Sequence, residues 1–145
     1  MLPHNQRKKQ TMPFFDFATD NDKEQKGIRR DYGDFWILMA RAGGANKKYE
    51  KSLERISAPH RRAIEIGKLP THIYTELLIQ VYADAVIKDW GGEGAVDQEG
   101  NVLACTKENV IKVFTAAPDL FSVVVQDAQN YELFKDEAIK ADSGN

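Results

Sequence analysis

The stretch that decides the fold runs from residue 82 to residue 134 and reads YADAVIKDWGGEGAVDQEGNVLACTKENVIKVFTAAPDLFSVVVQDAQNYELF. Residues that commonly start or end helices recur along it and indicate several helices in succession. Gly91 follows an apolar periodic run and predicts the end of a helix. Thr106 can cap the next helix, because a threonine hydroxyl accepts hydrogen bonds from first-turn amides. Pro118 ends that helix and opens another, since proline lacks an N–H and is favoured at the first helical position.

Working outward, further helices are predicted on both sides of this stretch. Asn46 is a candidate N-cap for a helix of about twelve residues. A short second helix is expected between Pro59 and Gly67. The longest helix is expected over 71–90, where apolar residues follow the 3.6-residue period. A last helix is expected from about Asn130, burying Tyr131, Phe134 and Ile139.

A β-hairpin is predicted at about residues 27–42. Its second arm, residues 35–42, is rich in aromatic and apolar side chains and is bounded by Gly-Asp on one side and Gly-Gly on the other. This arm is apolar on both faces. We therefore expect helices on one face, and either a partner or the apolar segment 12–17 on the other.

These elements predict a mainly α fold of the α+β class, with a small N-terminal β-hairpin followed by a compact bundle of about five helices. A chain of 145 residues is sufficient for one domain. We expect a flexible tail at 1–13, a single globular domain at 14–140 and a frayed end at 141–145.

Charge is distributed unevenly along the chain. Residues 1–42, 43–70 and 71–145 carry net charges of +2, +4 and −8. An acidic half is a poor surface for nucleic acid but suits a basic or amphipathic protein. A basic stretch is formed by Arg55, His60, Arg61, Arg62 and Lys68. Glutamates alternate with these residues, which is typical of a charged, solvent-exposed face, so nucleic-acid binding is not expected.

The sequence contains no catalytic motif that we recognise, and neither an enzyme nor a cofactor is expected. The histidines have no metal-ligand spacing. Residues 97–101 resemble the start of a calcium loop, but the order of ligands is wrong and an acidic turn is favoured. Cys105 is interpreted as a small half-buried hydrophobe. The longest apolar run is far shorter than the roughly 20 residues of a membrane span, so no membrane association is expected.

In their order, these motifs resemble the tail assembly chaperones of long-tailed bacteriophages. The likeness covers about residues 14–140: the segment 14–49, then Pro-His-Arg-Arg at 59–62 and Gly-Lys-Leu at 67–69, then 82–134. The resemblance implies a non-enzymatic protein of the bacterial host cytoplasm that binds the tape measure protein. It would keep that protein soluble during assembly of the tail tube, and it would be absent from the mature virion.

Helix-in-groove binding gives this role a physical basis, because a long helical partner exposes apolar stripes that a groove can cover. We expect the groove in the acidic half, with Trp90, Phe114 and Phe121 as candidate anchors. The tail tube protein and a second copy of the chain are further candidate partners. The alternative is a structural protein of the tail or head–tail junction, in which the strand at 35–39 mates with identical subunits.

Overall fold

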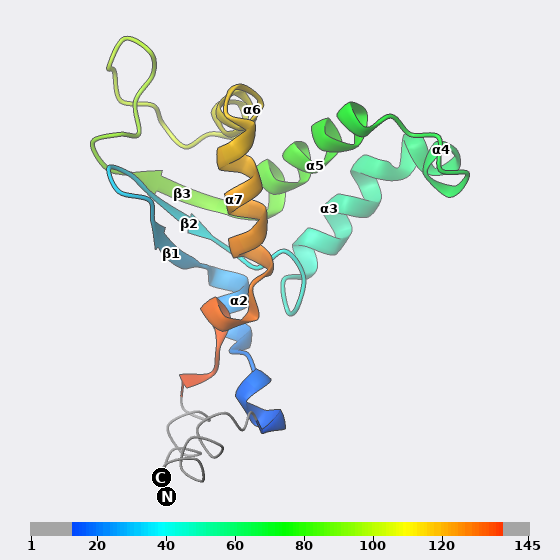
Figure 1. Cartoon of the computed structure of the whole chain (residues 1–145), viewed down its shortest axis with the longest axis horizontal. Coiled ribbons are helices and arrows are strands. Elements are labelled where there is room, and N and C mark those ends of the chain that lie inside the picture. The colour runs from blue at the N-terminus through cyan, green and yellow to red at the C-terminus, as the bar shows by residue number, and fades with distance from the viewer. Residues whose placement is uncertain (1–12, 138–145) are drawn as a thin grey trace, which may run out of the picture.

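The computed structural model describes residues 13–137 and consists of helices around one small sheet (Figure 1). The α-helices are α2 (Asn21–Lys26), α3 (Lys47–Ser57), α4 (Arg61–Glu65), α5 (Thr71–Ala85), α6 (Lys107–Ala116) and α7 (Pro118–Gln129). The 3-10 helices are η1 (Phe14–Phe17), η2 (Ala58–His60) and η3 (Tyr131–Phe134). The strands are β1 (Ile28–Asp31), β2 (Trp36–Met39) and β3 (Ile87–Gly91). The predicted fold class is confirmed.

The predicted hairpin is formed by β1 and β2. They pair antiparallel, with Ile28 opposite Met39 and Asp31 opposite Trp36. The connecting turn contains Gly33, whose φ of +95° lies in the region that favours glycine.

A third strand replaces the end of the predicted long helix. We expected a helix over 71–90, but α5 ends at Ala85 and the chain turns into β3, which pairs antiparallel with β2. The Ala40 amide donates to the Val86 carbonyl over 2.8 Å and joins the two segments. The prediction was wrong because β2 presents a second row of backbone groups, and pairing them favours a strand over another helical turn.

The sheet order is β1-β2-β3, so β2 is the central strand. Both of its edges are paired, which contradicts the idea that this strand mates with an identical subunit edge to edge. The apolar segment near the N-terminus does not cover the sheet either. Phe14 and Phe15 are 92% and 70% exposed, and Phe17 stacks on Tyr131 with ring centroids 5.0 Å apart.

The core lies between the sheet and helices α5, α6 and α7. Tyr82, Phe114 and Phe121 form its aromatic centre, with Phe121 centroids 5.3 Å from Tyr82 and 5.1 Å from Phe114. Aliphatic side chains from the strands and helices complete it; they include Ile37, Met39, Val86, Val110 and Val124.

Helices α3 and α5 pair to form an arm that extends away from the sheet and carries α4 at its far end (Figure 1). At the base of this arm, the ring of Tyr49 meets Tyr82 edge-on at 6.1 Å. The predicted short helix after Pro59 appears as η2 followed by α4, and Gly67 follows it with a φ of +69°.

Two of the predicted helix caps behave differently. Thr106 accepts a hydrogen bond from the Asn109 amide over 3.1 Å, as expected. Asn46 precedes α3 but caps nothing with its side chain. Instead its amide group donates to the carbonyls of Arg41 and Ala85, over 2.8 and 2.9 Å.

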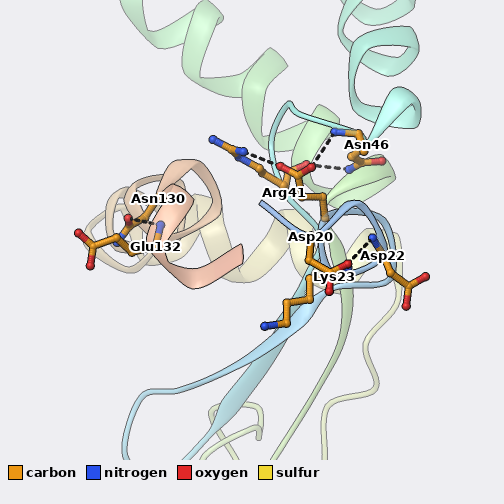
Figure 2. Close-up of polar contacts among 9 residues, drawn as sticks. Asp20, Asp22, Lys23, Arg41, Asn46, Asn130 and Glu132 are labelled. Carbon is orange, nitrogen blue, oxygen red and sulfur yellow. Dashed lines mark hydrogen bonds and ion pairs between the residues drawn. The ribbon is translucent and has the colours of Figure 1, made fainter. Parts of the chain in front are cut away.

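A buried ion pair ties α2 to the connection between β2 and α3. The Glu24 carboxylate accepts from the guanidinium of Arg41 and from the backbone amide of Ala45. Figure 2 shows Arg41 and Asn46 side by side, near the turn in which the Asp20 carboxylate caps α2. This network holds the start of the arm against the sheet.

The N-terminal and C-terminal segments of the described chain pair with each other. Thr19 and Lys135 form an antiparallel bridge, and the Asp20 amide donates to the Phe134 carbonyl over 2.8 Å. The predicted last α-helix is a 3-10 helix in the described residues, capped by Asn130. Ile139, the first twelve residues of the predicted tail and the predicted frayed end lie outside the described residues.

Candidate protein-binding surface

An apolar pocket of about 90 Å³ opens where β3 passes into the loop at 92–104. An engineered cavity of about 150 Å³ admits benzene, so a pocket of this size suits one aliphatic side chain. Strand, loop and helix residues line it together; they are Phe35, Ile37, Trp90, Gly94, Ala95, Val96, Leu103, Val113 and Leu120.

The loop that borders this pocket is held in place by hydrogen bonds. The indole Nε1 of Trp90 donates to the Leu103 carbonyl over 2.7 Å, and the Leu103 amide donates to Ala95 over 3.0 Å. Val96 and Val102 form an antiparallel bridge that narrows the loop into a hairpin. The pocket therefore exists before any partner binds, which lowers the ordering cost of binding.

Residues 97–101, whose sequence resembles the start of a calcium-binding loop, form a hydrogen-bonded turn. The Asp97 carboxylate accepts from the amides of Asn101 and Glu99, each over 2.9 Å. These backbone hydrogen bonds, that of Asn101 first, lower the pKa of Asp97. Within residues 13–137, no group of three or more His, Cys, Asp or Glu side chains is arranged to hold a metal ion.

The surroundings of the pocket are acidic. The segment 89–104 contains four carboxylates, Asp89, Glu93, Asp97 and Glu99, and no lysine or arginine. Asp34 and Asp119 stand next in sequence to lining residues, while Lys112 on α6 is a basic neighbour. A negative field of this kind favours basic partners.

Only one of the three predicted anchors lies at the surface. Trp90 is half-buried and lines the pocket. Phe114 is fully buried and Phe121 is 5% exposed, so their rings cannot contact a partner in this structure. Helical spacing of aromatics predicts a groove and a core equally well, and this is why sequence reasoning misplaced them. Val96, exposed within an acidic loop, was the signal that could have indicated the pocket.

The end of the arm carries a second exposed apolar area. Ile64, Ile66 and Tyr74 are 45%, 55% and 50% exposed. Ile64 and Tyr74, with Gly67 and Leu69, line a shallow hollow of about 200 Å³. The basic stretch predicted as a solvated face surrounds this area: Arg61, Arg62 and Lys68 are exposed and form no ion pair in the part of the chain that the structure describes.

Arg55, by contrast, is used within the fold. Its guanidinium contacts the Asp84 carboxylate over 2.9 Å, and Lys107 reaches the other carboxylate oxygen over 2.8 Å. Hydrogen bonds from Lys107 and then Arg55 hold the pKa of Asp84 well below its usual range. This carboxylate joins α3, α5 and α6.

Cys105 lies half-buried beside the pocket loop. Burial, with a smaller contribution from Asp89, raises the pKa of its thiol to about 11. The thiol is therefore protonated near neutral pH, which makes it a poor nucleophile.

Comparison with known families places the chain among phage proteins. The sequence profile of the family described as YdaY prophage protein matches residues 44–145. The chain belongs to this YdaY prophage protein family. The YdaY match begins at Gly44, before α3, and includes the arm, β3, the acidic loop, α6 and α7. No curated protein and no solved structure matches the chain.

None of the helices over residues 13–137 combines the length and the hydrophobicity that a membrane span requires.

Proposed function

We propose that this prophage protein is a tail assembly chaperone, which binds the tape measure protein and keeps it soluble while the tail tube assembles. It acts in the host cytoplasm, catalyses no reaction and leaves before the virion is complete. The observation that supports the proposal best is the preformed apolar pocket beside Trp90, set in an acidic surface. Membership of a prophage protein family supports the phage context.

The pocket suits a helical client. One apolar side chain from the client fills the pocket, since binding energy concentrates in such well-packed central contacts. Lysines or arginines on the same client helix then face Glu93 and Glu99 on the loop. The client's apolar stripe is covered in this way, one segment for each chaperone molecule.

Co-expression with the tape measure protein from the same prophage tests the proposal. Val96 is 36% exposed and lines the pocket, so Val96→Glu places a charge at its rim. We expect the wild-type chain to keep the tape measure protein in the soluble fraction and Val96→Glu to lose that effect. Leu53→Glu is the matched control, because Leu53 is 37% exposed but lies on α3. If the wild-type chain leaves the client's solubility unchanged, the proposal is wrong.

A virion structural role is the second candidate, and the free edges of β1 and β3 favour it. An unpaired strand edge can add strands from another subunit. Mass spectrometry of purified virions separates the two roles. A chaperone should be missing from the particles, whereas a structural protein should be present at a fixed ratio to the tail tube protein.

A further inference from the structure

Two exposed surfaces of this chain have complementary composition. The first, the arm tip, combines apolar Ile64, Ile66 and Tyr74 with Arg61, Arg62 and Lys68, which form no ion pair among residues 13–137. Residues 58–72 contain three lysine or arginine side chains and a single acidic side chain, Glu65. A large apolar side chain left exposed among cations is typical of an interaction surface.

The second surface, the loop tip, has the opposite charge. Val102 is 88% exposed and pairs with Val96 in the bridge that closes the hairpin of residues 96–102. Glu93 and Glu99 lie exposed in the same loop, where no basic residue occurs between 89 and 104. This surface, which we call the loop tip, therefore combines the exposed apolar Val102 with the exposed carboxylates of Glu93 and Glu99.

Within one molecule these surfaces cannot meet. The arm tip lies at the far end of the α3–α5 arm, and the loop after β3 lies on the other side of the molecule (Figure 1). We propose that copies of this chain associate head to tail, with the loop tip of one copy seated in the hollow at the arm tip of the next.

The hollow at the arm tip suits this occupant. Its volume of about 200 Å³ accommodates the Val102 side chain, and its lining by Ile64, Leu69 and Tyr74 is apolar. Arg61, Arg62 and Lys68 then face Glu93 and Glu99 across the contact, which gives them the ionic partners that they do not have among residues 13–137. Exposed apolar residues at the centre favour a protein occupant over nucleic acid, whose backbone would contact the cations alone.

A contact of this kind is heterologous, because each copy uses a different surface on each side. Every added copy leaves one arm tip and one loop tip free, so the association continues into a filament or closes into a ring. The proposal concerns the chain alone and does not depend on the chaperone role or on any client.

Purified full-length protein tests it in two steps. Analytical ultracentrifugation at low salt should show an average mass that rises with concentration above the monomer value of 16.4 kDa. Raising the salt to about 0.5 M should reduce the association, since charge attraction is then screened over a few ångströms. A monomer at every concentration at low salt would overturn the proposal.

Charge reversal identifies the surfaces. Arg61→Glu with Arg62→Glu makes the arm tip acidic, and Glu93→Lys with Glu99→Lys makes the loop tip basic. Each double variant alone should lose self-association by about tenfold or more, because its two surfaces then carry like charge. An equimolar mixture of the two variants should associate again. If the mixture stays monomeric, or if either variant associates as the wild type does, the surfaces are wrong.

The control makes the same change in net charge elsewhere. Lys48→Glu with Lys51→Glu alters two exposed lysines of α3 that lie outside the arm tip and form no ion pair in the described part of the chain. This variant should associate like the wild type. Equal loss of association in the control would show that overall charge, and not the arm tip, controls assembly. Circular dichroism of all variants verifies the fold.

Discussion

At the scale of single residues, Glu24 is the most deeply buried charged side chain among the described residues. It is 2% exposed; its carboxylate is neutralised by the Arg41 guanidinium and accepts a further hydrogen bond from the Ala45 amide. Gly44 fits against it: a Cβ built there would lie 2.2 Å from Glu24 Oε2, and the φ of +54° also favours glycine. The turn from β2 into α3 is therefore shaped around one buried charge.

Removing the partner of this charge should be costly. Arg41→Met leaves a buried carboxylate unpaired, and we expect a loss of about 2–4 kcal/mol in the free energy of unfolding, since Arg41 is itself partly exposed. Urea denaturation followed by circular dichroism measures it. Lys26→Met removes the exposed ion pair with Asp22 and should cost less than about 1 kcal/mol. Equal losses for the two variants would contradict the importance of burial.

Asp84 should make the free energy of unfolding depend on pH in the acid range. Its pKa in the folded chain is lowered by Lys107 and Arg55. The stabilisation is fully present above the unfolded value of about 3.9 and is lost as the pH falls through the lowered folded pKa. Asp84→Asn should cost about 1 kcal/mol at pH 7, because both cations are more than half exposed, and less at about pH 2. Urea titrations across that range measure the difference, and an equal cost at pH 7 and at about pH 2 would contradict this role of Asp84.

At the scale of elements, the loop after β3 depends on Trp90. Trp90→Phe keeps an aromatic ring in the pocket but removes the donor to Leu103. Loss of about 1 kcal/mol of local stability should speed hydrogen exchange of the Leu103 amide about fivefold. Exchange of the Val110 amide in α6 should stay as in the wild type. If the Leu103 amide exchanges at an unchanged rate, the indole does not hold the loop.

Elements that depend on local signals could be predicted from the sequence. Thr106 and Pro118 mark helix starts through their own chemistry, and the hairpin follows from apolar residues between glycines. The end of α5 could not be predicted, because residues 86–91 continue a helical pattern and become a strand only when β2 lies beside them. Asn46 was misjudged for a similar reason, since its true partner Ala85 is distant in sequence.

The candidate site was only partly predictable. The acidic half follows from composition, and a place for the half-buried Trp90 at the surface follows from the glycines after it. Assigning Phe114 and Phe121 to a core or a groove requires knowing which helices cover them. The joining of Phe35 with Leu103 and Leu120 in one pocket depends on long-range packing that no local pattern encodes.

At the scale of the whole molecule, the family match does not coincide with a folding unit. It begins at Gly44, yet Ile37, Met39 and Ala40 are at most 1% exposed and complete the core. A fragment of residues 44–145 should therefore fail to fold cooperatively, because it loses β2 and leaves β3 unpaired. Circular dichroism melting checks this, with the full chain as control. A cooperative transition like that of the full chain would show that the hairpin is dispensable.

The bridge between Thr19 and Lys135 brings the two ends of the described segment together at one pole of the molecule. In Figure 1 this pole lies away from both the acidic loop and the end of the arm. A reporter or bead attached at either end of the described segment, residues 13–137, would thus be tethered at the same pole. A sample immobilised in this way would leave both the acidic loop and the end of the arm accessible to a client or to a second copy of the chain.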